Sequence, residues 1–277
     1  MAECLHSPII NADSRQVYKE IPIGTAAPTA AEQARVRHYF VGTRSVRESY
    51  SAGQYAADAL KLIEDLHQQQ DVVVMAGGGM MYIDAVCRGL DDIPQVSPAV
   101  REQVRKEYEV NGLEWLQEAV RTADREYFTR VDIHNPQRLM HALEVSRQTG
   151  VPYSTFLGRE RRRNNFRVVQ WQLTRPREEL YERIDKRVLQ MMEDGLEAEA
   201  RSVYEWRQLS SLQTVGYREL FAYFSGETSK DEAIRQIQQH SRNYAKRQLT
   251  WWRGKKDIRE VDIRDSDRLI DEAIKLG

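Results

Sequence analysis

The segment DVVVMAGGGMMY, residues 71–82, constrains the fold of this 277-residue chain most strongly. Its apolar run at 72–76 is β-branched and lacks polar alternation, which is typical of a strand covered on both faces in a parallel sheet. The three glycines at 77–79 predict a turn that leads into a helix. Strand, glycine turn and helix together indicate an α/β architecture built from βαβ units.

Three further segments predict strands, and they share apolar or β-branched character: 8–12, 166–174 and 258–263. A helix is expected over 51–70, with Ser51 as its N-cap. From Pro94 to Arg163 the strand signal stops and successive helical patterns follow. We therefore expect an α/β core made of residues 1–95 and 165–277, with a helical insertion domain at 96–164.

Composition excludes several classes of protein. Charged residues make up 30% of the chain, and no apolar run approaches the roughly 20 residues that span a bilayer. The N-terminal residues lack the pattern of a secretory signal. The two cysteines, Cys4 and Cys87, form no disulfide framework, and no Cys or His cluster predicts a metal site. A cytoplasmic protein without membrane contact, and a monomer, is expected.

Positive charge is concentrated although the net charge is only −1. Residues 241–256 hold six basic side chains and no acidic one, interleaved with Tyr244, Trp251 and Trp252. Cations beside stacking aromatics suit RNA, whereas a solvated helix face is the alternative. Residues 159–167 hold five arginines, which form either a second basic patch or an exposed loop.

Polar residues at the ends of predicted strands are candidates for chemistry. Asp13 follows the strand at 8–12, where open parallel sheets bind ligands, although on the single residue a turn or capping role is favoured. The glycines at 77–79 could expose backbone N–H groups to an anion or a base edge, or form an ordinary turn. No G-x-x-x-x-G-K-[ST] phosphate loop occurs in the chain.

In order along the chain, several segments carry a resemblance to a known family: NADSRQVYKEIPIGTAAPT, ESYSAGQYAADAL, GGGMMY, NPQRLMHALEV, ERIDKRVLQMMEDGLEAEA, TVGYREL and YAKRQLTWWRG. Together they resemble the tRNA dimethylallyltransferases. The resemblance covers nearly the whole chain and implies a P-loop-kinase-like parallel sheet flanked by helices, with a helical insertion. It also implies transfer of a dimethylallyl group from dimethylallyl diphosphate to N6 of adenosine 37, beside the tRNA anticodon.

The resemblance assigns roles to residues. Asp13 would be the general base, and Ser14, Arg15 and Gln16 would line the adenosine pocket beside it. The remaining tRNA contacts would be Gly79, Arg101, Gln137, Arg138, His141, Gly216, Tyr217, Arg218, Lys246, Arg247, Gln248, Trp251 and Arg253. Arg218 is a candidate for an RNA or a diphosphate contact. Arg183 and Arg187, four apart on one helix, could contribute to the diphosphate site, although a solvated helix face is the favoured interpretation for them. Mg²⁺ would accompany the diphosphate, and the anticodon stem-loop would be the macromolecular partner.

Two departures from the family pattern stand out. The first strand and Walker A loop of the family are expected to be missing in front of Met1, which leaves open whether this chain is active and predicts lower stability or pairing with another chain. Gly79 stands where the family has Thr or Ser, and the lost hydroxyl is worth about 1 kcal/mol. A tRNA-binding protein without catalysis is one alternative. A nucleotide-type kinase is the other, disfavoured because it also needs a phosphate loop and gains nothing from the basic segment.

Overall fold

The computed structural model describes residues 1–91, 93–158, 165–255 and 257–275. Two compact units are present, the first made of Met1–Cys87 and Asn164–Gly277 and the second of Arg88–Arg163. That the two units act as separate domains remains a prediction. The arginine-rich run at 159–163 lies outside the described residues.

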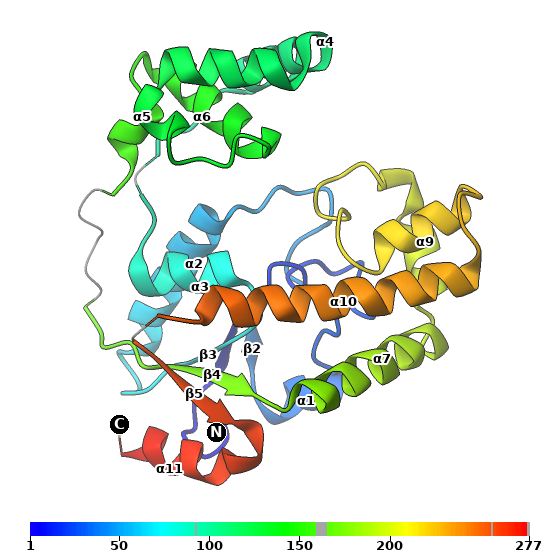
Figure 1. The fold of residues 1–277 in the computed structure, drawn as a ribbon. Coiled ribbons are helices and arrows are strands. Elements are labelled where there is room, and N and C mark those ends of the chain that lie inside the picture. The colour runs from blue at the N-terminus through cyan, green and yellow to red at the C-terminus, as the bar shows by residue number, and fades with distance from the viewer. Residues whose placement is uncertain (92, 159–164, 256, 276–277) are drawn as a thin grey trace. The chain divides into compact units, whose positions relative to one another are not determined.

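A short parallel sheet forms the centre of the first unit. Strands β1 (Ile9–Asn11), β2 (His38–Tyr39) and β3 (Val74–Ala76) are ordered β2-β1-β3, and all pairs are parallel (Figure 1). Because Asn11 aligns with Ala76, the carboxyl ends of β1 and β3 meet at one edge. Asp13 and the glycine turn therefore leave the sheet side by side.

The other two strands form a separate parallel pair, β4 (Gln170–Thr174) with β5 (Ile258–Asp262). The strands predicted at 166–174 and 258–263 are thus confirmed in part. A single continuous sheet was expected, and this was wrong for the described residues. Among them β3 pairs only with β1 and β4 only with β5, so no ladder joins the two sheets. The α/β architecture itself, parallel strands flanked by helices, is confirmed.

The helices of the first unit follow the expected patterns. Ser51 caps α2 in a reciprocal capping box with Gln54, as predicted for a helix start. The helical elements are α1 (Ala30–Arg35), α2 (Ala52–Leu66), α3 (Met80–Arg88), α7 (Arg177–Glu193), α8 (Leu196–Ser202), η2 (Tyr204–Trp206), α9 (Tyr217–Phe224), α10 (Lys230–Trp252), η3 (Ile263–Asp265) and α11 (Ser266–Ile274).

Two apolar clusters hold α2, α3, α7, α8, α9 and α10 around β1 and the loop that follows it. In the first, Ile10 of β1 packs with Tyr55 and Tyr82, whose rings stack with centroids 4.2 Å apart. The second gathers the loop after β1 against α7, α8, α9 and α10, through residues such as Val17, Ile21 and Leu196. Burying these side chains supplies the driving force that holds the loop in place.

The second unit is helical. It contains α4 (Pro98–Ala123), α5 (Arg125–Phe128), α6 (Pro136–Thr149) and the 3₁₀ turn η1 (Tyr153–Phe156). Gly112 adopts φ 78° and interrupts the helical backbone inside α4, and Gly150 closes α6 in the left-handed region. No strand occurs among its residues 88–91 and 93–158. None of the described helices of either unit is long and apolar enough to span a membrane.

Candidate active site

Asp13 uses one carboxylate oxygen to build its own loop. Its Oδ1 accepts hydrogen bonds from the backbone N–H groups of Arg15 at 2.7 Å and Gln16 at 3.2 Å. Its own N–H donates to Asn11 Oδ1 at 3.3 Å. The other oxygen, Oδ2, has no hydrogen-bond partner among the described residues. Asp13 is therefore compatible with both interpretations, the capping residue and the chemical group. Its Oδ1 caps a turn, and its Oδ2 remains free as an acceptor.

The glycine turn packs directly on the backbone of Ala12 and Asp13. Gly79 N–H donates to the Ala12 carbonyl oxygen at 2.9 Å. A Cβ on Gly77 would lie 2.4 Å from the Ala12 carbonyl carbon, and one on Gly79 would lie 2.4 Å from the Ala12 oxygen. The glycines are thus required by the close approach of two backbones rather than by a left-handed φ.

Restoring a side chain at position 79 is expected to destabilise the protein. Gly79→Ser would place its Cβ against a backbone carbonyl that cannot move independently, at a cost of about 1–3 kcal/mol in the free energy of unfolding. Urea denaturation measures this change. Ala76→Ser, at an exposed position next to the turn, adds the same hydroxyl without the clash and serves as control. Equal stability of the two variants would show that the steric account is wrong.

Helix α10 docks on the same turn. Tyr244 Oη donates to the Gly78 carbonyl oxygen at 3.1 Å, and Gln248 Nε2 donates to the same oxygen at 2.8 Å. A Cβ on Gly78 would lie 2.4 Å from Gln248 Nε2 and 3.7 Å from Asp13 Oδ2. The free oxygen of Asp13, the turn and two polar side chains of α10 therefore converge on one small region.

The C-terminal end of α10 is fixed to α3. Trp251 Nε1 donates to Asp84 Oδ2 at 2.9 Å, and Lys255 Nζ lies 2.7 Å from the same oxygen. The Lys255 ammonium also lies over the rings of Trp251 and Trp252. Trp251, predicted to contact tRNA, is 37% exposed, so part of its ring remains accessible.

Away from the turn, α10 exposes cations. Lys246, Arg247 and Arg253 are exposed, and the Arg247 guanidinium lies 5.5 Å from the centroid of the Tyr244 ring. By contrast, Arg242 forms an ion pair with Asp185 of α7. Three predicted tRNA contacts therefore remain on the solvent side of the helix.

The two residues after Ser14 hold neighbouring loops. Arg15 NH1 donates to the Ser211 carbonyl at 3.2 Å. Gln16 Nε2 donates to the carbonyls of Thr25 and Ala26, each at 3.0 Å. Ser14 is half-buried, and its backbone N–H lies near Gly79. The polar groups of Arg15 and Gln16 thus stabilise the walls around Asp13, while their contact with adenosine stays a prediction.

Tyr217 was predicted to contact tRNA, and this is wrong for its side chain, which is 0% exposed. Its hydroxyl donates to Glu199 Oε1 at 2.6 Å. The Glu199 carboxylate also accepts from the N–H groups of Ile23 and Gly24, both at 2.8 Å. Burial, together with the Glu199 charge, raises the pKa of Tyr217 above its ordinary value. The side chain therefore holds α9 and α8 to the loop after β1.

Arg218 remains exposed beside this buried network. Its side chain is 48% exposed, and its NH2 lies 3.7 Å from Glu219 Oε1. Glu219 is 3% exposed and accepts from Gly216 N–H at 2.8 Å and from His240 Nδ1 at 2.6 Å. Gly216 adopts φ 98°, which favours glycine at the start of α9. The turn therefore presents Arg218 to solvent.

The weaker diphosphate candidates lie on α7. Arg183 and Arg187 are exposed there, one helical turn apart. No hydrogen bond or ion pair joins either of them to Asp13 or Arg218 in the part of the chain that the structure describes. Their role stays a prediction.

In the second unit three predicted tRNA residues share one pocket of about 330 Å³. Its lining consists of Tyr127, Arg130, Val131, Gln137, Arg138, His141 and Tyr153. The His141 ring meets Tyr153 edge-on at 5.5 Å. Burial and the nearby charge of Arg101 lower the pKa of His141. Arg101, the fourth predicted residue of this unit, therefore lies within electrostatic range of the pocket.

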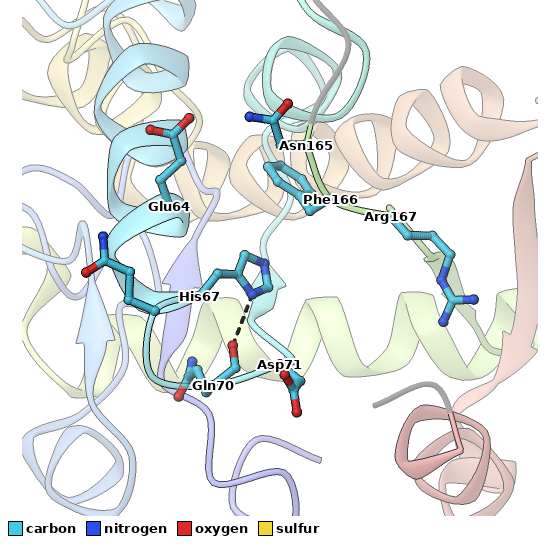
Figure 2. A pocket seen from close by; sticks show the side chains of 8 residues that line it. Glu64, His67, Gln70, Asp71, Asn165, Phe166 and Arg167 are labelled. Atoms are coloured by element: carbon cyan, nitrogen blue, oxygen red, sulfur yellow. Dashed lines mark hydrogen bonds between the residues drawn. The ribbon is translucent and has the colours of Figure 1, made fainter.

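The larger hollow in the first unit, about 420 Å³, lies at the opposite end of the sheet. Figure 2 shows its lining side chains, among them His67, whose Nδ1 is 3.1 Å from the Gln70 carbonyl oxygen. Residues 70–71 precede β3 and residues 165–167 precede β4, so this hollow adjoins the amino ends of the strands. Asp13 lies at the carboxyl end, where parallel sheets bind their ligands.

Sequence reasoning missed the half-buried carboxylate Glu199 and the buried carboxylate Glu219. A signal for Glu199 exists, because it lies between Leu196 and Val203 on the apolar face of its helix. A glutamate in such a position needs a buried partner. Glu219 is the third residue after Gly216 at a helix start, which is the capping-box position.

Comparisons with known proteins all give one family. The family model of IPP transferase matches residues 16–255. A tRNA dimethylallyltransferase of Porphyromonas gingivalis is 51% identical over 94% of this chain and 86% of its own length. The crystal structure of a tRNA isopentenylpyrophosphate transferase from Bacillus halodurans superposes with a TM-score of 0.69 at 30% identity, over 99% of this chain and 92% of that chain.

The fold extends to a more distant structure. A eukaryotic dimethylallyltransferase acting on tRNA superposes with a TM-score of 0.79 at 23% identity, covering 94% of this chain and 68% of that one. The family match begins at Gln16 and ends at Lys255, so it includes most of the loop after Asp13, the glycine turn and α10. The chain therefore belongs to the IPP transferase family of tRNA dimethylallyltransferases.

Proposed function

We propose that this chain transfers a dimethylallyl group from dimethylallyl diphosphate to N6 of adenosine 37 in tRNA, with Asp13 as the general base. The observation that carries the proposal is the free Oδ2 of Asp13, which lies beside Gly78. The other carboxylate oxygen, Oδ1, is fixed by its hydrogen bonds to the loop. A fixed carboxylate at the carboxyl edge of a parallel sheet is suitably placed to accept a proton from a bound base.

The chemistry needs such a group. The lone pair of adenine N6 is delocalised into the ring, so the amine is a poor nucleophile. As N6 bonds to the first carbon of the dimethylallyl group, the bond from that carbon to the diphosphate oxygen breaks and diphosphate leaves. The proton of N6 passes to Asp13 Oδ2. The negative charge that develops on the leaving oxygen requires cations. The cation that we assign is Arg218, the exposed guanidinium beside the buried Glu219.

Mg²⁺ would accompany the diphosphate. No group of three or more His, Cys, Asp or Glu side chains among the described residues could hold a metal ion by itself. This fits Mg²⁺, which keeps several waters and is held through one or two carboxylates plus substrate phosphates. When bound, the ion would neutralise part of the diphosphate charge, and we assign it no protein ligand because Asp13 Oδ2 is kept for the N6 proton.

RNA recognition would use both units. Adenosine 37 must leave the anticodon-loop stack to reach a carboxylate. The exposed cations of α10 would bind phosphates, and the pocket that contains Gln137, Arg138 and His141 would accept an unstacked base beside Tyr127. Arg253 and the accessible part of Trp251 would extend the contact on α10.

The α10 contact is testable by salt dependence. Lys246→Ala and Arg247→Ala are each expected to weaken binding of an anticodon stem-loop and to reduce the slope of log K against log salt by about 1. Fluorescence anisotropy at several salt concentrations measures both quantities. Arg235→Ala, on the same helix but ion-paired with Glu232, is the matched control and should leave the slope unchanged.

The outcome separates the proposal from its rival. Salt-dependent binding together with transfer supports the transferase. Binding without transfer, under conditions in which the Porphyromonas gingivalis relative transfers the group, would favour a tRNA-binding protein without catalysis. An unchanged slope in both α10 variants would remove α10 from the RNA interface.

A further inference from the structure

Two side chains of α10 donate to a single acceptor. Tyr244 Oη and Gln248 Nε2 lie 3.1 Å and 2.8 Å from the carbonyl oxygen of Gly78. They are four residues apart on the helix and so share one face. A carbonyl oxygen has two lone pairs, and both are used here. Together with the bond from Trp251 to Asp84, these contacts dock one face of α10 on the turn and helix that follow β3.

The docked turn is pressed between α10 and the backbone at Asp13. Gly77 and Gly79 leave no room for a Cβ against Ala12, and the Cβ position of Gly78 is 3.7 Å from Asp13 Oδ2. A displacement of the turn would therefore change the surroundings of the free carboxylate oxygen. Burial, and secondarily the Asp13 charge, raises the pKa of Tyr244, so its hydroxyl stays protonated and able to donate.

The outer face of the same helix carries the exposed Lys246 and Arg247. At about 100° per residue Lys246 lies roughly opposite the face that Tyr244 and Gln248 share. Arg247 lies at the edge of that face, with its guanidinium 5.5 Å from the centroid of the Tyr244 ring. One turn of α10 thus has a cationic outer side and an inner side bonded to Gly78. RNA bound on the outer side would therefore lie across α10 from the Asp13 carboxylate.

We propose that Tyr244 and Gln248 are positioning residues that hold the glycine turn against Asp13, so that the helix that binds RNA also sets the geometry of the catalytic carboxylate. The catalytic part of this inference rests on the proposed function. For Gln248 the inference replaces a direct tRNA contact, because its amide nitrogen is committed to Gly78. Tyr244 gains a role beyond stacking.

Hydrogen exchange tests the structural part without any need for activity. In Tyr244→Phe or Gln248→Ala one donor to the Gly78 carbonyl oxygen remains. The amide exchange rate across residues 77–83 should therefore change less than threefold, because only one contact is lost. The double variant leaves that oxygen with neither donor, and exchange should accelerate by about tenfold or more. Gln238→Ala is the matched control, because Gln238 on the same helix donates to the Asp185 carbonyl of α7.

Transfer and binding measurements test the catalytic part. The double variant should bind the anticodon stem-loop within about twofold of the parent, while kcat for transfer falls by about tenfold to a hundredfold. Weakened RNA binding with unchanged exchange at 77–83 would make these residues RNA contacts and overturn the proposal. Equal exchange in the double variant and Gln238→Ala would also overturn it. If the parent transfers no dimethylallyl group, the proposed function fails, and the exchange result still decides the positioning role.

Discussion

Replacing Asp13 with Asn is expected to lower the rate of dimethylallyl transfer by about 10²- to 10⁴-fold, the usual contribution of a positioned general base. The asparagine can keep the loop, because its Oδ1 can still accept from the N–H groups of Arg15 and Gln16. Its side-chain NH₂ then takes the place of Oδ2 and cannot accept the N6 proton. Single-turnover transfer to an anticodon stem-loop, measured beside RNA affinity, separates the chemical step from binding.

The control for this prediction is Asp58→Asn. Asp58 is a partly exposed carboxylate of α2 that accepts from Tyr50 and Arg44, away from the glycine turn. This variant should transfer at close to the parent rate. A fall of less than threefold in Asp13→Asn, with RNA affinity retained, would show that Asp13 is a capping residue and that the proton leaves by another route.

Removing Glu199 is expected to be the most destabilising change. Glu199→Ala leaves the N–H groups of Ile23 and Gly24 without their acceptor. The buried hydroxyl of Tyr217 keeps only its longer bond, 3.3 Å, to the Ile21 carbonyl oxygen. Each unsatisfied buried group costs about 1–3 kcal/mol, so the free energy of unfolding should fall by about 3 kcal/mol or more. The loop that continues from Asp13 would lose its attachment to α8 and α9. Urea denaturation monitored by circular dichroism measures the loss.

Glu197→Ala provides the comparison on the same helix. Glu197 forms an ion pair with the exposed Lys230, and exposed pairs contribute about 0–1 kcal/mol. A loss of less than about 1 kcal/mol is therefore expected for this variant. If both variants lost the same amount, the Glu199 carboxylate would not be the attachment point that its three hydrogen bonds indicate.

Local patterns predicted the parts of the fold whose causes are local. The β-branched run before the glycines became β3, and Ser51 capped α2, because strand propensity and capping depend on neighbouring residues. The two-residue strand β2 was missed, since His38 and Tyr39 are too short a run for any periodicity. The division of the strands over two sheets was missed too, because pairing is decided by contacts distant in the sequence.

The site shows the same limit. A polar strand tip and a basic helix were visible in the sequence as Asp13 and the 241–256 segment. The bond from Gln248 to Gly78 spans 170 positions and that from Glu199 to Gly24 spans 175, so no local pattern reports them. Tyr217 illustrates the consequence. Its place in a motif predicted an RNA contact, whereas tertiary packing buries it completely.

The most direct test of the central claim is product analysis of a single reaction. The chain would be incubated with Mg²⁺, labelled dimethylallyl diphosphate and an anticodon stem-loop that contains adenosine 37, and the RNA digested to nucleosides for mass spectrometry. We predict N6-dimethylallyl-adenosine from this stem-loop and none when position 37 is guanosine. Tight binding of the stem-loop with no labelled nucleoside, or label on a different nucleoside, would contradict the account.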